Sequence, residues 1–151
     1  FQDVHTAPRP ARQPHPPIWV GGSGDAALRR AVRYGDAWHP IRIRLDSFKQ
    51  TGIPRLEAMA AEEGLPVPGI CPRIRLRLTD SPVATEDRAA GEGSLDQVHR
   101  DLAGLESLGC DYVILDTYFD DPEATRHSET SWRMLSVMAE KVLDLDNQRV
   151  R

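Results

Sequence analysis

Short apolar runs alternate with amphipathic helical patterns along the chain, and this alternation constrains the fold more than any other feature of the sequence. Strands are predicted at residues 18–20, 36–41, 70–79 and 112–115, and helices at residues 25–34, 45–63, 95–108 and 130–144. Repeated strand–helix units predict an α/β fold with a parallel sheet and right-handed crossovers. Four such units are half of an eight-stranded barrel, which typically needs about 250 residues, so we expect an open sheet or part of a larger barrel.

Two of these segments carry further local signals. Residues 52–54 read Gly-Ile-Pro and predict a break in the second helix. In the third strand, arginines at positions 73, 75 and 77 alternate with apolar residues, so one face is apolar and the other is basic. Ser94 is a good N-cap for the third helix.

The remaining segments define the domain organisation. Residues 1–17 hold five prolines and predict an extended connector. Residues 18–145 then form one domain, with a polar loop at residues 80–93 and an acidic loop at residues 119–128. We expect residues 146–151 to be a frayed tail.

Composition and charge argue against several classes of partner. The formal net charge is -4 and the isoelectric point about 5.7, which argues against nucleic acid or an anionic membrane as the main partner. No apolar stretch approaches the roughly 18 residues of a membrane span. Cys71 and Cys110 have neither metal-ligand spacing nor a disulfide framework around them, so we expect no metal site and a cytoplasmic location.

A glycine-rich turn follows the first predicted strand and opens the first helix. It consists of Gly21, Gly22, Ser23 and Gly24. In parallel α/β proteins ligands bind at the carboxyl ends of strands, where free backbone N–H groups and the positive end of a helix dipole attract phosphate. The Ser23 hydroxyl adds a donor. Alternatively, the glycines only form a tight turn that lets strand and helix pack, and the motif alone leaves both explanations open.

Two blocks of sequence carry a recognisable pattern: PPIWVGGSGDAALRRAVRYGDAWHP at residues 16–40 and GSLDQVHRDLAGLESLGCDYVILD at residues 93–116. Both resemble the luciferase-like monooxygenase superfamily, in particular its F420-dependent oxidoreductases. The blocks occur in the order and spacing of the family, and the resemblance extends over about residues 8–145. Ala37 departs from the family pattern, which often has glycine there.

The resemblance implies a fold and a cofactor. It implies a TIM (β/α)8 barrel whose fifth to eighth strands correspond to the present four, so that the chain is its C-terminal half. It also implies that residues 21–24 bind the phosphate of coenzyme F420 or, alternatively, FMN. The implied activity is hydride transfer between the reduced cofactor and an unidentified small organic substrate.

The same resemblance leaves an alternative to an active enzyme. The chain is then a catalytically inactive fragment or an assembly half that needs a partner with the first four strands. An open half-barrel exposes two strand edges and an apolar inner face, so we expect either a homodimer or pairing with the N-terminal half.

Several single residues have both a functional and a structural explanation. His39, at the end of the second strand, could move a proton at the mouth of the site, or bond to the backbone. Trp38 could pack on the cofactor ring or fill the core. The three arginines of the third strand could bind the acidic tail of F420 or form an ion-paired face. Asp116 ends the last strand and could be catalytic or order the following loop. Cys110 is expected to be a small core residue.

Overall fold

The strands that the alternation predicts run parallel and follow one another in the predicted order. The computed structural model describes residues 7–118 and 120–151. β1 (Trp19–Gly21), β2 (Ala37–His39) and β3 (Gly69–Ile70) form a parallel sheet in that order. β4 (Arg73–Arg75) pairs in parallel with β7 (Ile114–Asp116), and a parallel bridge between Ile41 and Arg73 joins the two groups. The α/β class with parallel strands is therefore confirmed.

The predicted strand at residues 70–79 is divided into three short strands. After β3 and β4 comes β5 (Arg77–Leu78), which pairs in parallel with β6 (Glu92–Gly93). Pro72 has no N–H to donate to a ladder, and the segment changes partner on either side of it. The N–H of Cys71 donates to the carbonyl of Trp38, and that of Leu76 donates to the carbonyl of Asp116. The polar loop at residues 80–93 thus contains β6 and a short 3-10 turn, η2 (Thr85–Asp87).

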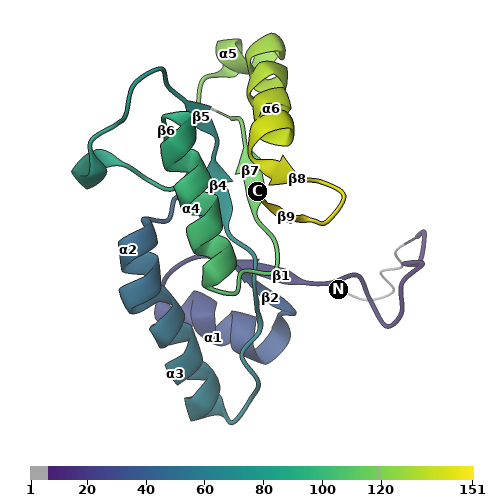
Figure 1. Ribbon diagram of the computed structural model, residues 1–151. Helices are drawn as coiled ribbons and strands as arrows, with labels where there is room; N and C mark the ends of the chain where they lie inside the picture. Colours follow the sequence, from purple (N-terminus) through teal and green to yellow (C-terminus); the bar gives the residue numbers. More distant parts are fainter. Residues whose placement is uncertain (1–6, 119) are drawn as a thin grey trace.

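α1 (Asp25–Tyr34) packs against α3 (Ile53–Glu63), and both lie below β1 in Figure 1. α1 has its predicted bounds and ends at Gly35. The expected break near residue 53 is instead a continuous helical path: α2 (Leu45–Ser47), the π-helical segment η1 (Phe48–Gly52) and α3 (Ile53–Glu63). Proline in a helix interior clashes with the preceding turn, and the wider π turn directly before Pro54 accommodates it.

The described residues after β6 form three helices and a hairpin. α4 (Leu95–Ser107) begins after its N-cap Ser94, whose backbone N–H donates to Gln97 Oε1 at 3.0 Å. α5 (Pro122–Arg126) lies within the predicted acidic loop, of which residue 119 is outside the described residues. α6 (Glu129–Lys141) follows. Where the sequence predicts a frayed tail, β9 (Arg149–Val150) pairs antiparallel with β8 (Leu143–Asp144).

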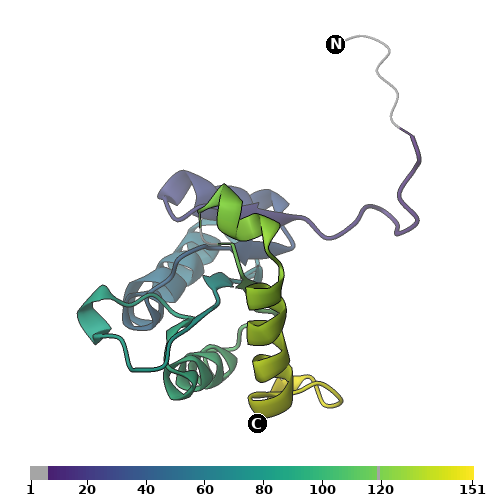
Figure 2. The ribbon, with the colours of Figure 1, turned by 90° about the horizontal axis from the view of Figure 1, so that it is seen from above.

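The hydrophobic core lies between the helices and one face of the strands. Seen from above, α1, α3, α4 and α6 follow one another along an arc, and residues 7–17 extend away from the rest without a helix or strand (Figure 2). Apolar side chains of these helices and of the strands' helix-facing side fill the core. The most buried include Leu28, Ala31, Leu56, Ile74, Leu76, Val98, Leu105 and Met138.

The opposite face of the strands carries an aromatic cluster of Trp19, His39 and Tyr112, in which His39 is half-buried. The ring of Trp19 lies 5.6 Å from that of His39 and 5.8 Å from that of Tyr112. Trp19 is 37% exposed and Tyr112 64% exposed. Since side chains alternate along a strand, Val20 points into the core while Trp19 points away from it.

Candidate active site

The glycine turn contains a backbone conformation that favours glycine, at Gly22. Gly22 has φ +106°, and a Cβ there would lie 2.7 Å from the Cβ of Ala27. Only glycine fits this conformation without strain. Gly24 is the N-cap of α1 with extended backbone, and nothing lies within 4 Å of the position that its Cβ would take. The turn is therefore tightly packed at Gly22 and open at Gly24.

Several backbone N–H groups of the turn and of the start of α1 have no hydrogen-bond partner among the described residues. The first N–H groups of any helix lack an intrahelical partner. Within the described residues, no hydrogen bond is made by the backbone N–H groups of Ser23, Gly24, Asp25 and Ala26, or by the Ser23 hydroxyl. Gly24 supplies no side-chain cap for them. Donors of this kind are the chemical match for a phosphate group.

Trp38 lies beneath the turn rather than on its surface. It is only 3% exposed and packs in the core, with its ring 5.5 Å from that of Phe48. Its indole Nε1–H donates to the carbonyl oxygen of Gly22 at 2.7 Å. Of the two explanations for Trp38, the structure thus places the side chain in the core, where it supports the turn.

A cavity of about 280 Å³ opens beside the turn, and its lining brings in arginines that sequence patterns do not indicate. Ser23 lines it together with Arg42, Arg44 and Arg55. Arg55, from α3, is ion-paired with Asp25 in the first turn of α1. This pair offsets the negative charge that a carboxylate would otherwise place beside an incoming phosphate. Arg55 has no spacing relation to the glycines, so only the packing of α3 on α1 reveals it.

The other two arginines of this cavity have partners outside it. Arg44 donates to the backbone carbonyl oxygens of Thr85, at 3.2 Å, and Glu86. Arg42 is ion-paired with Asp120. They shape the cavity wall and connect it to the loops that follow β5 and β7.

His39 is fixed by a backbone hydrogen bond. Its Nδ1 lies 2.5 Å from the carbonyl oxygen of Cys71, and because a carbonyl only accepts, Nδ1 carries the proton. The ring is half-buried beside Trp19. This is the backbone-bonded arrangement that the structural explanation expects. It also leaves Nε2 as the nitrogen that could exchange a proton with a ligand.

Two of the three alternating arginines are ion-paired. Arg73 donates to Asp116 Oδ2 through Nε at 2.9 Å and through Nη2 at 2.6 Å. Arg75 is paired with Asp120 and lies 3.8 Å from Glu92. Desolvation favours the neutral form of Asp120, but hydrogen bonds and charge from Arg75 and Arg42 lower its pKa below the ordinary value.

Both carboxylate oxygens of Asp116, at the end of β7, accept hydrogen bonds from the protein. Besides its pairing with Arg73, its Oδ1 accepts a hydrogen bond from the backbone N–H of Tyr118 at 3.0 Å. A carboxylate that accepts from the residue two positions ahead orders the turn after the strand. The loop-ordering explanation therefore has direct geometric support.

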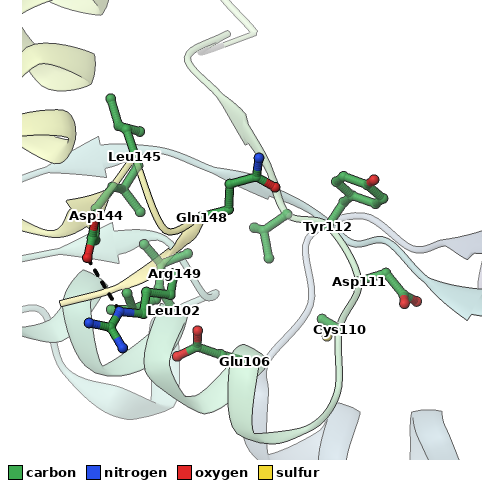
Figure 3. Close-up of a pocket in the computed structure, with 12 residues that line it drawn as sticks. Leu102, Glu106, Cys110, Asp111, Tyr112, Asp144, Leu145, Gln148 and Arg149 are labelled. Carbon is green, nitrogen blue, oxygen red and sulfur yellow. Dashed lines mark hydrogen bonds and ion pairs between the residues drawn. The ribbon is translucent and has the colours of Figure 1, made fainter.

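A second cavity, of about 320 Å³, lies at the other end of the strands. Glu106 from α4, Tyr112 before β7 and Arg149 of the hairpin surround it (Figure 3). It opens at the amino end of β7. Ligands of parallel α/β proteins bind at the carboxyl ends of strands, so we place the candidate site at the glycine turn and not here.

Cys110 lines this second cavity as an unreactive thiol. Burial, helped by Cys71 and Asp111, raises its pKa to about 12. Burial likewise raises the pKa of Cys71, and both cysteines are free. Since the thiolate is the reactive form, neither side chain is a nucleophile near neutral pH.

Two other kinds of feature are absent from residues 7–118 and 120–151. These residues contain no group of three or more His, Cys, Asp or Glu side chains placed to hold a metal ion. None of their helices is long and apolar enough to cross a membrane.

Comparison with solved structures finds a similar fold in an oxidoreductase. The chain is similar to an F420-dependent secondary alcohol dehydrogenase in complex with an F420-acetone adduct, with a TM-score of 0.53 and 13% sequence identity. The similarity covers 66% of this chain and 42% of that one, so the chain spans less than half of the solved protein. At this identity the likeness concerns the fold alone.

Comparison of sequences gives the family. No match was found among curated protein sequences. The model of the luciferase-like monooxygenase family matches residues 1–99, which include the whole of the first resembling block and end within the second. The chain therefore belongs to the luciferase-like monooxygenase family.

Proposed function

We propose that this chain is part of a flavin- or deazaflavin-dependent oxidoreductase that transfers a hydride between a reduced cofactor and a small organic substrate. Membership of the luciferase-like family supports this proposal. A solved protein of similar fold is an F420-dependent secondary alcohol dehydrogenase, which supports F420 over FMN. The residues of the two resembling sequence blocks favour F420 as well.

The observation that carries the proposal is the open glycine turn. Its unpaired N–H groups, the Ser23 hydroxyl and the free space at Gly24 fit the phosphate of either cofactor. Arg55 lines the adjoining cavity and adds a positive charge at its edge. Trp38 acts as a positioning residue, since it holds the Gly22 carbonyl and so the turn.

The cofactor would supply the hydride chemistry, and the protein residues would bind and orient it. His39 is the candidate proton carrier. Its Nδ1–H is committed to the Cys71 carbonyl, which fixes the ring and leaves Nε2 for a ligand. We expect removal of the imidazole to lower turnover more than cofactor affinity.

The second candidate function is that of an assembly half without activity of its own. The aromatic cluster, with its exposed Trp19 and Tyr112, favours it, because a barrel interior is filled by side chains from all eight strands. In this proposal the chain is the C-terminal half of a TIM barrel, and its inner face is covered by the other four strands or by a second copy. We also propose a cytoplasmic location, which the two free cysteines support.

The test is a titration of the purified chain with F420 and with FMN, followed by fluorescence, with the mass in solution recorded on each sample. Saturable binding of one cofactor supports the oxidoreductase and identifies the cofactor. A folded chain that binds neither contradicts cofactor binding by this chain alone. Binding that appears only when the first four strands are supplied in trans supports the assembly half.

A further inference from the structure

Arg77 differs from the two arginines that precede it in the alternating row. Arg73 and Arg75 are held by carboxylates, whereas the Arg77 guanidinium has no hydrogen bond or ion pair within the described part of the chain. Its backbone N–H donates to the Gly91 carbonyl at 3.0 Å, which fixes the strand but not the side chain. The side chain is exposed and free to bind a ligand.

Arg133 on α6 is a second arginine without a partner for its side chain in the described part of the chain. It too is exposed. Arg77 and Arg133 line one cavity of about 560 Å³ between the end of β5 and α6. Thr130 and Thr79 also line it, and Met134 and Val137 give it an apolar floor.

The charges of this lining favour an anion. Two guanidinium groups stand against one carboxylate, that of Asp80. The Thr79 hydroxyl donates to the Ser81 carbonyl at 2.6 Å, whereas the Thr130 hydroxyl has no partner within the described residues. Arginine presents a planar fork of donors that matches the oxygens of carboxylate and phosphate.

The location of the cavity also fits a ligand site. Leu76, the residue before β5, donates its backbone N–H to the carbonyl oxygen of Asp116, the last residue of β7. β5 therefore begins where β7 ends, so the cavity lies toward the carboxyl edge of the strands. Its volume falls in the usual range for small-molecule sites, about 300–1,000 Å³. A single phosphate or carboxylate would occupy only part of it, which leaves the apolar floor for an organic body.

We propose that Arg77 and Arg133 form an oxyanion site, distinct from the glycine turn, that binds the phosphate or carboxylate group of a small organic molecule. The site requires no cofactor and no activity, so it stands or falls separately from the oxidoreductase proposal. Phosphate and carboxylate share the chemistry that the two guanidinium groups recognise, and the choice between them is experimental.

The test follows the side-chain Nε–Hε signals of arginine by NMR on the full chain with labelled arginine. Inorganic phosphate and a triglutamate peptide are added to separate samples. The variants are Arg77→Gln, Arg133→Gln and the double change, with Arg100→Gln as control. Arg100 is exposed on α4, has no partner within the described residues and does not line the cavity, so its change removes the same charge elsewhere.

We expect saturable shifts of the Arg77 and Arg133 signals with at least one probe. Each cavity variant should weaken that binding by about tenfold or more, because a charge-assisted hydrogen bond is lost, and Arg100→Gln should leave it unchanged. Response to phosphate alone identifies a phosphorylated ligand, and response to the peptide identifies a carboxylate. Two results would overturn the proposal: no shift of either signal with both probes, or equal weakening by the cavity variants and the control. The wild-type signals decide the matter even where a variant fails to fold.

Discussion

The indole Nε1 of Trp38 donates a hydrogen bond to the carbonyl oxygen of Gly22 at 2.7 Å. This bond connects the hydrophobic core to the turn that opens α1. Trp38 is 3% exposed, so the core fixes its ring and the ring fixes the turn. A turn held in this way is organised before any ligand arrives, which reduces the entropy that binding must overcome.

Replacement of Gly22 by alanine should destabilise the fold strongly. Its φ of +106° and the 2.7 Å approach to the Cβ of Ala27 leave no room for a methyl group. We expect a loss of about 3 kcal/mol in the free energy of unfolding, measured by urea denaturation. Gly64→Ala is the control: Gly64 also has positive φ, but nothing lies within 4 Å, so about 1 kcal/mol is expected. Equal losses for the two variants would show that crowding at Gly22 is unimportant.

Trp38→Phe should destabilise the chain by about 1–3 kcal/mol, since it removes ring volume from the core and leaves the Gly22 carbonyl without its donor. Trp19→Phe is the matched change at a site that is 37% exposed, and less than about 1 kcal/mol is expected there. Thermal unfolding of both variants provides the comparison. A Trp38 variant as stable as the Trp19 variant contradicts the supporting role of the indole.

The ion pairs of Glu63 predict how stability depends on pH. Glu63, at the end of α3, accepts hydrogen bonds from Arg33 of α1 at 2.7 Å and 3.0 Å and is also paired with Arg29. Hydrogen bonding by Arg33 lowers its pKa below the ordinary value of 4.5, although burial opposes the change and Arg29 adds to it. Because the folded pKa is the lower one, the stabilisation is complete above the ordinary pKa and is lost as pH falls through the folded value.

The variant Glu63→Gln should therefore be less stable than wild type near about pH 7, and the difference should shrink as the pH falls below about 4. Urea unfolding across this range measures it. Glu62→Gln is the control, because Glu62 is 65% exposed and its contact with Arg29 is 4.0 Å. A difference between wild type and Glu63→Gln that is independent of pH would rule out the carboxylate as its source.

The order of the strands and the place of the turn follow from local signals in the sequence. Apolar runs, helical periodicity and glycine are properties of a few neighbouring residues, so they predict β1, α1 and the turn at residues 21–24 correctly. The division of residues 70–79 could have been anticipated from Pro72, which cannot join a ladder. The π-helical segment before Pro54 is harder to predict from the sequence, because proline more often ends a helix than follows a π-helical turn within one.

The partners of the charged residues could not be predicted, because they depend on which helices and loops come together. The pairing of Arg55 with Asp25 requires α3 to lie beside α1. Equally, nothing in the alternation of residues 73–77 distinguishes the unpaired Arg77 from the paired Arg73. The hairpin of β8 and β9 has two residues in each strand, which is too short for a periodicity to be visible.

Gly24 is a position where a charged side chain can be introduced into the turn without a steric clash. Its backbone is extended, with φ -83° and ψ 163°, and the space around its Cβ position is open, so any side chain fits. Aspartate and asparagine are both good N-caps, and each should stabilise α1 by a few tenths of a kcal/mol relative to glycine. Gly24→Asp places a carboxylate where the phosphate is proposed to bind, whereas Gly24→Asn is the same cap without the charge. Denaturation should show both variants to be as stable as wild type or slightly more so.

Binding of each cofactor and of its phosphate-free counterpart to these two variants tests the proposed phosphate site most directly. F420 is compared with its deazaflavin core, and FMN with riboflavin, by fluorescence titration. We predict that wild type binds the phosphorylated form of one pair more tightly, and that Gly24→Asp reduces this affinity about tenfold or more relative to Gly24→Asn. The phosphate-free form should bind both variants equally. The phosphate site is contradicted if wild type does not distinguish the phosphorylated from the phosphate-free form, or if Gly24→Asp and Gly24→Asn bind the cofactor alike.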